Sequence, residues 1–312
     1  MLFERDSECV IVYKRLESLD CKSIRNNREY SEKVMCVMEV EILEEKADSL
    51  RFILRDSSPA FANALRRGML ADVPVMAVED VIFLENTSVM YDEILAHRLG
   101  LVPLKTDLDA YVPREECDCK SDLGCPKCTA SFVFEAEATD QTITVYSADL
   151  KAATDVVPTT DRIPIVKLAP GQKVKLEAYA RLGRGSEHAK WQAASIAAYR
   201  YVPKVTLRPE NLSNPEDVIK CCPPRVYASD STRKIFIKNE LDCILCNACV
   251  EKAVPSDQKK GLPIEIKGDG TAFLFQIEST GALPPRRILR EAGSILIKKA
   301  EAMTVLVEAE QK

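Results

Sequence analysis

The sequence predicts an α+β fold in which antiparallel sheets combine with a small number of helices. Residues 131–182 alternate apolar and polar side chains in short pieces separated by Pro and Gly, which is typical of antiparallel strands. Residues 286–308 instead repeat apolar side chains every three or four positions, as a helix does. Two close-spaced cysteine groups, within 117–128 and 243–249, indicate metal ligation in a reducing compartment rather than a disulfide scaffold.

Composition and charge limit the function classes. The 312 residues have room for about two domains, and a hydrophobic content of 46% supplies their cores. With 43 Lys and Arg against 48 Asp and Glu, the net charge of −5 excludes the positive field of a stand-alone duplex-binding protein, so DNA contact is expected only indirectly. Apolar runs fall short of the roughly 20 residues of a membrane helix, and charges occupy the start of the chain where a signal peptide is apolar. A soluble cytoplasmic protein is expected.

Residues 1–37 are polar and mixed, with no sustained periodicity, and Met38 follows them. We interpret this stretch as a weakly structured extension or as the product of an upstream start codon. Cys9, Cys21 and Cys36 share no ligand-like spacing, which favours free thiols.

The next segments predict a compact unit of strands and helices. Ser58 is a suitable N-cap, Pro59 suits the first position of a helix, and Pro74 ends the helical pattern. In order, we expect a hairpin with strands at 40–43 and 50–54, a helix at 59–71, a strand at 75–84 and a second amphipathic helix at 91–101.

The helix near the C-terminus has an apolar face that nothing nearby covers. Leu289, Leu296 and Met303 belong to a stripe that repeats by three or four residues along 286–308. The stripe is nearly a coiled-coil seam and is too long for a small domain to cover, so a partner helix is predicted. The alternative is that this helix lies on the chain's own sheet, since a strand is predicted at 264–277.

The first cysteine group comprises Cys117, Cys119, Cys125 and Cys128, in the spacing C-x-C-x5-C-x2-C on a loop that contains Gly and Pro. Four thiolates on one tight loop suit tetrahedral Zn(II), and a closed four-sulfur shell leaves no position for a substrate. We therefore predict a structural zinc site, with free thiols or a redox pair as the alternatives.

The second cysteine group comprises Cys243, Cys246 and Cys249, in the C-x2-C-x2-C spacing of bacterial ferredoxin loops. Ala253 stands where those loops have a further Cys-Pro, so a fourth ligand has to come from elsewhere. Cys222, which precedes Pro223, is the favoured fourth ligand, and Cys221 is the alternative. One iron–sulfur cluster is predicted, with [4Fe-4S] favoured over [3Fe-4S].

The chain contains few residues of the types and spacings that catalytic sites use. His97 and His188 are the two histidines, and no Walker-type or dinucleotide-type glycine loop is present. Asp107 and Asp109 are too few for two-metal nucleotidyl transfer. A packed aromatic is the favoured interpretation of Trp191, over a ligand pocket. No catalytic residue is predicted.

Three segments strongly resemble the D-subunit family of archaeal RNA polymerase, the counterpart of the bacterial alpha subunit and of the eukaryotic third-largest subunit. They are residues 58–67, 92–104 and 188–191, and the resemblance runs from residue 38 to about residue 309. It implies a non-catalytic assembly platform of DNA-directed RNA polymerase, in which nucleotidyl transfer belongs to the whole complex.

The resemblance also implies domains and partners. An alpha-subunit-like dimerisation domain would comprise 38–84 and 264–312, with an inserted β-rich domain at 85–206 and a ferredoxin-like domain at 207–263. Its two helices would pair with subunit L, and the pair would nucleate subunits N and P and the large B subunit. The implied partner-binding residues are Phe61, Leu65, Arg66, Arg67, Leu289, Leu296 and Met303, with Arg66 and Arg67 facing the large subunit.

Two other roles for the cluster remain open. A ferredoxin-like electron carrier is the alternative function, although no flavin or nicotinamide site accompanies the cluster. The cluster would also allow oxygen or iron status to control polymerase assembly.

Overall fold

The computed structural model describes residues 2–5, 8–11, 38–232, 234–257 and 261–310. By their contacts these residues fall into two compact units. The first comprises Met1–Leu43, Phe52–Ala62 and Tyr199–Phe275, and the second comprises Glu44–Arg51, Asn63–Ala198 and Gln276–Lys312. Each unit is therefore assembled from segments that are distant in the sequence.

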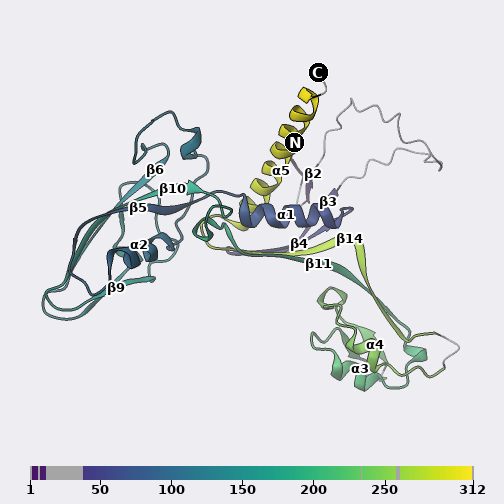
Figure 1. Cartoon of the computed structure of the whole chain (residues 1–312). Coiled ribbons are helices and arrows are strands. Elements are labelled where there is room, and N and C mark those ends of the chain that lie inside the picture. Colours follow the sequence, from purple (N-terminus) through teal and green to yellow (C-terminus); the bar gives the residue numbers. More distant parts are fainter. Residues whose placement is uncertain (1, 6–7, 12–37, 233, 258–260, 311–312) are drawn as a thin grey trace. The chain divides into compact units, whose positions relative to one another are not determined.

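Helices and strands alternate irregularly along the chain (Figure 1). The α-helices are α1 (Pro59–Ala71), α2 (Asp92–Gly100), α3 (Pro215–Cys221), α4 (Ala248–Lys252) and α5 (Pro285–Glu310). The strands are β1 (Leu2–Arg5), β2 (Glu8–Ile11), β3 (Met38–Glu45), β4 (Ser49–Arg55), β5 (Val75–Asn86), β6 (Thr129–Glu137), β7 (Ile143–Tyr146), β8 (Lys151–Ala152), β9 (Pro164–Leu168), β10 (Lys173–Gly183), β11 (Ala194–Leu207), β12 (Tyr227–Ser229), β13 (Ile235–Ile237) and β14 (Ile264–Ser279). Short 3-10 helices are η1 (Arg114–Glu116), η2 (Ser147–Asp149), η3 (Ala189–Trp191), η4 (Pro209–Asn211) and η5 (Glu240–Asp242).

The largest sheet has the order β1-β2-β3-β4-β14-β11. Its core includes Phe52, whose ring stacks on that of Phe275 with centroids 4.9 Å apart, and Tyr199, whose ring lies 5.2 Å from Phe275. The Lys46 N–H donates to the Ser49 carbonyl in the turn between β3 and β4, so the predicted hairpin is confirmed.

Strands β1 and β2 lie within residues 1–37, for which the sequence predicts weak structure. They form an antiparallel pair, and β2 also pairs with β3. Backbone pairing of this kind needs no sustained side-chain pattern, since a sheet edge offers unpaired N–H and C=O groups to any extended segment. The rest of that stretch, including Cys21 and Cys36, lies outside the described residues.

A four-stranded antiparallel sheet of order β5-β10-β6-β8 forms the core of the second unit. Leu176, Ala178 and Ala180 of β10 are fully buried, and their neighbours along the strand are half-buried. Helix α2 and the β7-β9 pair pack against the same core. The predicted antiparallel strands and second helix are thus confirmed, and β5 pairs with β10 through residue 86, beyond the domain boundary expected at 84.

Helices α1 and α5 approach each other closely in the second unit. At Gly68 a Cβ would lie 3.6 Å from the Cβ of Ala292, so the missing side chain lets the two backbones come together. Asp72, directly after α1, forms an ion pair at 2.7 Å with Lys299 of α5. The Ser58 hydroxyl accepts a hydrogen bond from the Phe61 N–H at 3.2 Å, as the predicted N-cap should.

Candidate functional site

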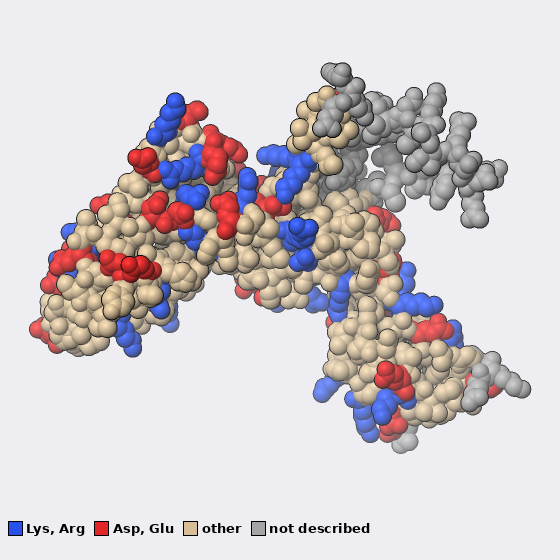
Figure 2. Space-filling view, in the orientation of Figure 1, with Lys and Arg blue, Asp and Glu red and all other residues tan. Residues whose placement is uncertain are grey.

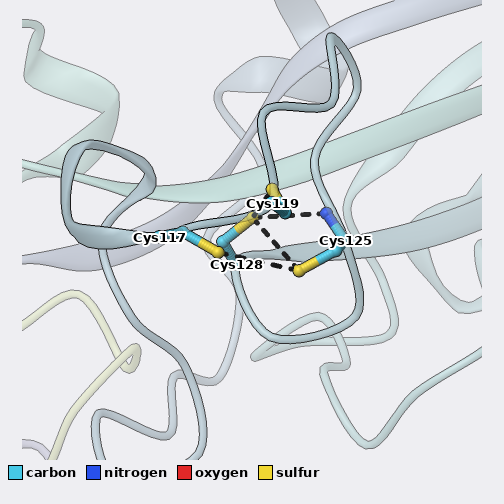
Figure 3. Close-up of side chains that lie close together, drawn as sticks. All are labelled: Cys117, Cys119, Cys125 and Cys128. Carbon is cyan, nitrogen blue, oxygen red and sulfur yellow. Dashed lines mark hydrogen bonds between the residues drawn. The ribbon is translucent and has the colours of Figure 1, made fainter.

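The four cysteines of the first group come together on the loop before β6. Their sulfurs all lie within 4.8 Å of one another and point toward a common centre (Figure 3). The Sγ–Sγ distances are 3.7 Å for Cys117 to Cys125, 3.8 Å for Cys119 to Cys128 and 3.9 Å for Cys125 to Cys128. A disulfide would place two sulfurs at about 2.05 Å, so these are separate thiols.

This spacing suits a single metal ion with four sulfur ligands. With Zn–S bonds of about 2.3 Å, the edge of a regular tetrahedron of sulfurs is about 3.8 Å. The observed distances match that edge, and Cys128 is fully buried while the other three thiols are half-buried. The four-cysteine group can therefore bind a metal in a closed shell.

Local backbone geometry holds the loop in this form. Gly124 has φ of +86°, and a Cβ there would collide with the Thr129 side chain, so the loop requires glycine at this position. The Cys125 N–H donates to the Cys128 sulfur at 3.3 Å, and the Arg114 guanidinium donates to the Ser121 carbonyl at 3.1 Å. Hydrogen bonds within the loop therefore help to hold the four sulfurs in place.

Two thiols of the group, Cys117 and Cys128, have pKa values shifted in opposite directions. Burial favours the protonated form of Cys128, but the Cys125 N–H, the Thr129 hydroxyl and neighbouring thiols outweigh it and lower the pKa of Cys128 to about 7. At Cys117 a hydrogen bond accepted from the Cys119 backbone N–H favours the thiolate, yet burial and the neighbouring thiols raise the pKa of Cys117 to about 12. Four thiolates so close repel one another, so a bound cation is what would allow all of them to ionise.

Two cysteines of the second group, Cys243 and Cys249, lie with Cys222 in a small buried cluster of the first unit. Cys222, Cys243 and Cys249 are 4–8% exposed, Cys221 is half-buried and Cys246 is exposed. The Val226 N–H donates to the Cys222 sulfur at 3.4 Å, and the Tyr227 hydroxyl lies 3.3 Å from the Cys249 sulfur. The structure therefore brings the C-x2-C-x2-C loop and the Cys221–Cys222 pair into one region.

The pKa of Cys249 depends on other residues of the same region. Burial raises the pKa of the Cys249 thiol; Tyr227 opposes this, and the charges of Cys222 and Cys243 raise the pKa further. Leu245 and Asn247 have φ of 59° and 60°, the left-handed region that bulky residues seldom adopt. The free thiols of Cys222, Cys243, Cys246 and Cys249 are a donor set that suits iron and sulfide.

The expected partner-binding residues differ in accessibility. Leu65 is 2% exposed and belongs to the chain's own core, so it offers no contact surface. Phe61, Leu289 and Leu296 are half-buried. Arg67 is exposed, whereas Arg66 is half-buried and donates to the Asn63 side chain at 2.9 and 3.1 Å.

The end of α5 is apolar and exposed. Met303 and Leu306 are each 68% exposed and Val307 is 48% exposed. These three residues, the α5 ridge, lie on one helix face because they are spaced by three and four positions. In Figure 2 the upper part of α5 is mostly tan, that is, uncharged, while acidic and basic side chains are interspersed over the sheet of the second unit.

Trp191 lies in a network of hydrogen bonds and a cation–π contact that the sequence does not predict. The ring is 3% exposed, its Nε1–H donates to the Arg181 carbonyl at 3.2 Å, and the Lys190 ammonium lies 4.3 Å from its centroid. The Lys190 ammonium also donates to the Val78 carbonyl at 2.9 Å and to the Glu79 carboxylate. The packed-aromatic interpretation of Trp191 is confirmed, and the network joins β5, β10 and η3.

No helix in the described ranges is both long enough and apolar enough to cross a membrane.

Comparison with known proteins decides the family. Residues 81–201 match the family model of the RNA polymerase Rpb3/RpoA insert domain. The DNA-directed RNA polymerase subunit Rpo3 of Archaeoglobus fulgidus is 41% identical over 271 residues, which cover 86% of this chain and 98% of that protein. The chain belongs to the Rpo3 family of DNA-directed RNA polymerase subunits. Rpo3 of Methanosphaera stadtmanae is 38% identical over 88% of this chain and all of that protein, and RNA polymerase II subunit rpb3 of Dictyostelium discoideum is 36% identical over 84% and 92%.

Membership of the Rpo3 family confirms the resemblance found in the sequence. The matched insert domain covers the second half of β5, the whole of β6 to β10 and just over half of β11, and it includes the four-cysteine loop and Trp191. These Rpo3 and rpb3 relatives bear the names of polymerase subunits, which does not support the electron-carrier alternative.

Proposed function

We propose that the chain is a non-catalytic assembly platform of DNA-directed RNA polymerase in the cytoplasm. It would pair with subunit L and then hold subunits N and P and the large B subunit, and the nucleotidyl transfer would belong to the assembled complex. DNA would be reached only through that complex.

The α5 ridge carries this proposal. Three large apolar side chains at the end of a 26-residue helix are exposed, and exposed apolar patches on a soluble protein mark interaction sites. A partner helix lying along α5 would cover the ridge and would also contact Leu289 and Leu296. Obligate interfaces of this kind bury about 2,000 Å² or more. Arg67, which is exposed, is the better placed of the two arginines to meet the large subunit.

In this proposal the two cysteine groups hold structural cofactors. Zn(II) would be held by Cys117, Cys119, Cys125 and Cys128, where it would stabilise the loop before β6. One iron–sulfur cluster, [4Fe-4S] by preference over [3Fe-4S], would be held by Cys243, Cys246, Cys249 and Cys222, with Cys221 as the alternative fourth ligand.

Co-expression of the full-length chain with subunit L tests the platform role. We expect a 1:1 heterodimer on size-exclusion chromatography with light scattering, and a chain that associates with itself or precipitates when produced alone. A stable soluble monomer that gains nothing when subunit L is added would refute the proposal. Metal and sulfide analysis of the same anaerobic preparation tests the two cofactors separately.

A further inference from the structure

The segment that leads into the cysteine loop is fixed to a strand of the large sheet. Arg200 of β11 donates from Nη1 to the Cys243 carbonyl at 2.9 Å and from Nη2 to the Leu241 carbonyl at 2.7 Å. Both acceptors belong to the backbone that enters the C-x2-C-x2-C loop. A guanidinium with two fixed donors orients two peptide planes at once, which a single-point donor does not do.

Two further contacts hold the same segment in place. The Glu240 carboxylate accepts a hydrogen bond from the Val205 N–H of β11 at 2.5 Å. The Leu241 side chain packs against a cluster formed by Ile53, Val202 and neighbouring residues of β14. The ligand loop therefore has a fixed starting point on the sheet, with Cys243 directly after it.

Arg200 also brings a positive charge next to Cys243, because its Nη1 donates to the Cys243 carbonyl at 2.9 Å. Arginine stays charged at all physiological pH values. Hydrogen bonds and charges outside the ligand shell set both the affinity of a site for its metal and the reduction potential of a cluster.

We propose that Arg200 is a positioning residue for the iron–sulfur cluster: it fixes the Cys243 backbone on β11 and supplies positive charge beside the cluster thiolates. The inference rests on the cluster of the proposed function. Two consequences follow from it. Loss of the two hydrogen bonds speeds the release of iron, and loss of the charge lowers the reduction potential, because the reduced cluster carries more negative charge.

Two variants separate these consequences in the full-length chain co-expressed with subunit L and purified without oxygen. R200Q removes the charge, whereas R200K keeps the charge and loses the paired donors. R208Q is the matched control, since Arg208 lies directly after β11 and donates to the Leu262 carbonyl at 2.7 Å and to the Glu265 carboxylate at 2.9 Å, neither of which belongs to a ligand cysteine.

The readouts are iron and sulfide content, the rate of iron loss to a chelator, and the midpoint potential of the cluster. We expect R200Q and R200K to lose iron about tenfold faster or more, as for other residues behind metal ligands. The potential should fall in R200Q and stay near the wild-type value in R200K and R208Q.

The outcomes distinguish this inference from the function on which it rests. A wild-type chain without iron and sulfide would refute the cluster itself. If the wild-type chain holds a full cluster and R200Q has the same rate of iron release and the same midpoint potential, the role of Arg200 is refuted. The cluster itself would not be refuted by that result. If R200Q fails to fold, R200K decides the positioning role, since unchanged iron release in that variant overturns it.

Discussion

The α5 ridge offers the sharpest test of how this chain meets a partner. We consider the double variant Met303→Ala, Leu306→Ala, in which both side chains are removed while the helix is preserved. Each residue is 68% exposed, so neither contributes much to the fold of the chain itself. Alanine also has a high helix propensity, which keeps α5 intact. The variant therefore isolates the apolar contact surface from the stability of the monomer.

The magnitude follows from the exposed fraction. Complete burial of a Leu or Met side chain is worth about 1.5–3 kcal/mol. Because about two thirds of each side chain is open to a partner, each should contribute roughly 1–2 kcal/mol to binding. Their joint removal should then cost roughly 2–4 kcal/mol, which corresponds to a Kd about 30- to 900-fold higher.

Dissociation of the co-expressed heterodimer on dilution, followed by analytical ultracentrifugation, measures this change in Kd. Leu262→Ala is the matched control, because Leu262 is 56% exposed but lies far from α5 in the sequence, and it should bind as the wild type does. The melting temperature of each variant should stay within a few degrees of the wild-type value. If the double variant binds subunit L as tightly as the wild type, the α5 ridge is not the docking surface.

Two further predictions concern the insert domain. Cys119→Ser should reduce the bound metal of the four-cysteine loop well below one equivalent and lower the melting temperature, as measured by metal analysis and calorimetry, whereas full metal content in the variant would contradict a four-sulfur site. Lys190→Met should lower the free energy of unfolding by about 1–3 kcal/mol, since Lys190 donates to the Val78 carbonyl and to Glu79. Burial raises the pKa of Glu79, but Lys190 and Arg181 outweigh it and hold that pKa below its ordinary value of 4.5. A carboxyl whose pKa is lowered by folding stabilises the fold at pH values above its unfolded pKa. This contribution is lost as the pH falls through the lower pKa of the folded state. Denaturant unfolding should therefore show the largest difference between wild type and variant near neutral pH and a smaller one below pH 4, and a difference that does not depend on pH would contradict the Glu79 pairing.

Local signals in the sequence were sufficient for several elements. Ser58 and Pro59 indicated where α1 begins, because capping and a preset φ depend on neighbouring residues alone. The four-cysteine loop was equally local, since its ligands lie within twelve residues and a short loop has few ways to arrange them. The burial of Leu65 was not predictable in this way. Phe61 and Leu65 lie on the same face of α1, yet Phe61 is half-buried and Leu65 is fully buried in the chain's own core.

By itself, the sequence determined the α+β class, the order of the main elements, the family and the four-cysteine group, all of which depend on spacing along the chain. Only the tertiary structure decided that Lys190 meets Glu79, 111 residues earlier, and that Arg200 holds the backbone of Cys243. It also decided which part of α5 remains uncovered. The physical reason is that burial, ion pairing and hydrogen bonding between distant residues depend on which surfaces meet after folding, and no periodicity in one segment specifies its neighbour.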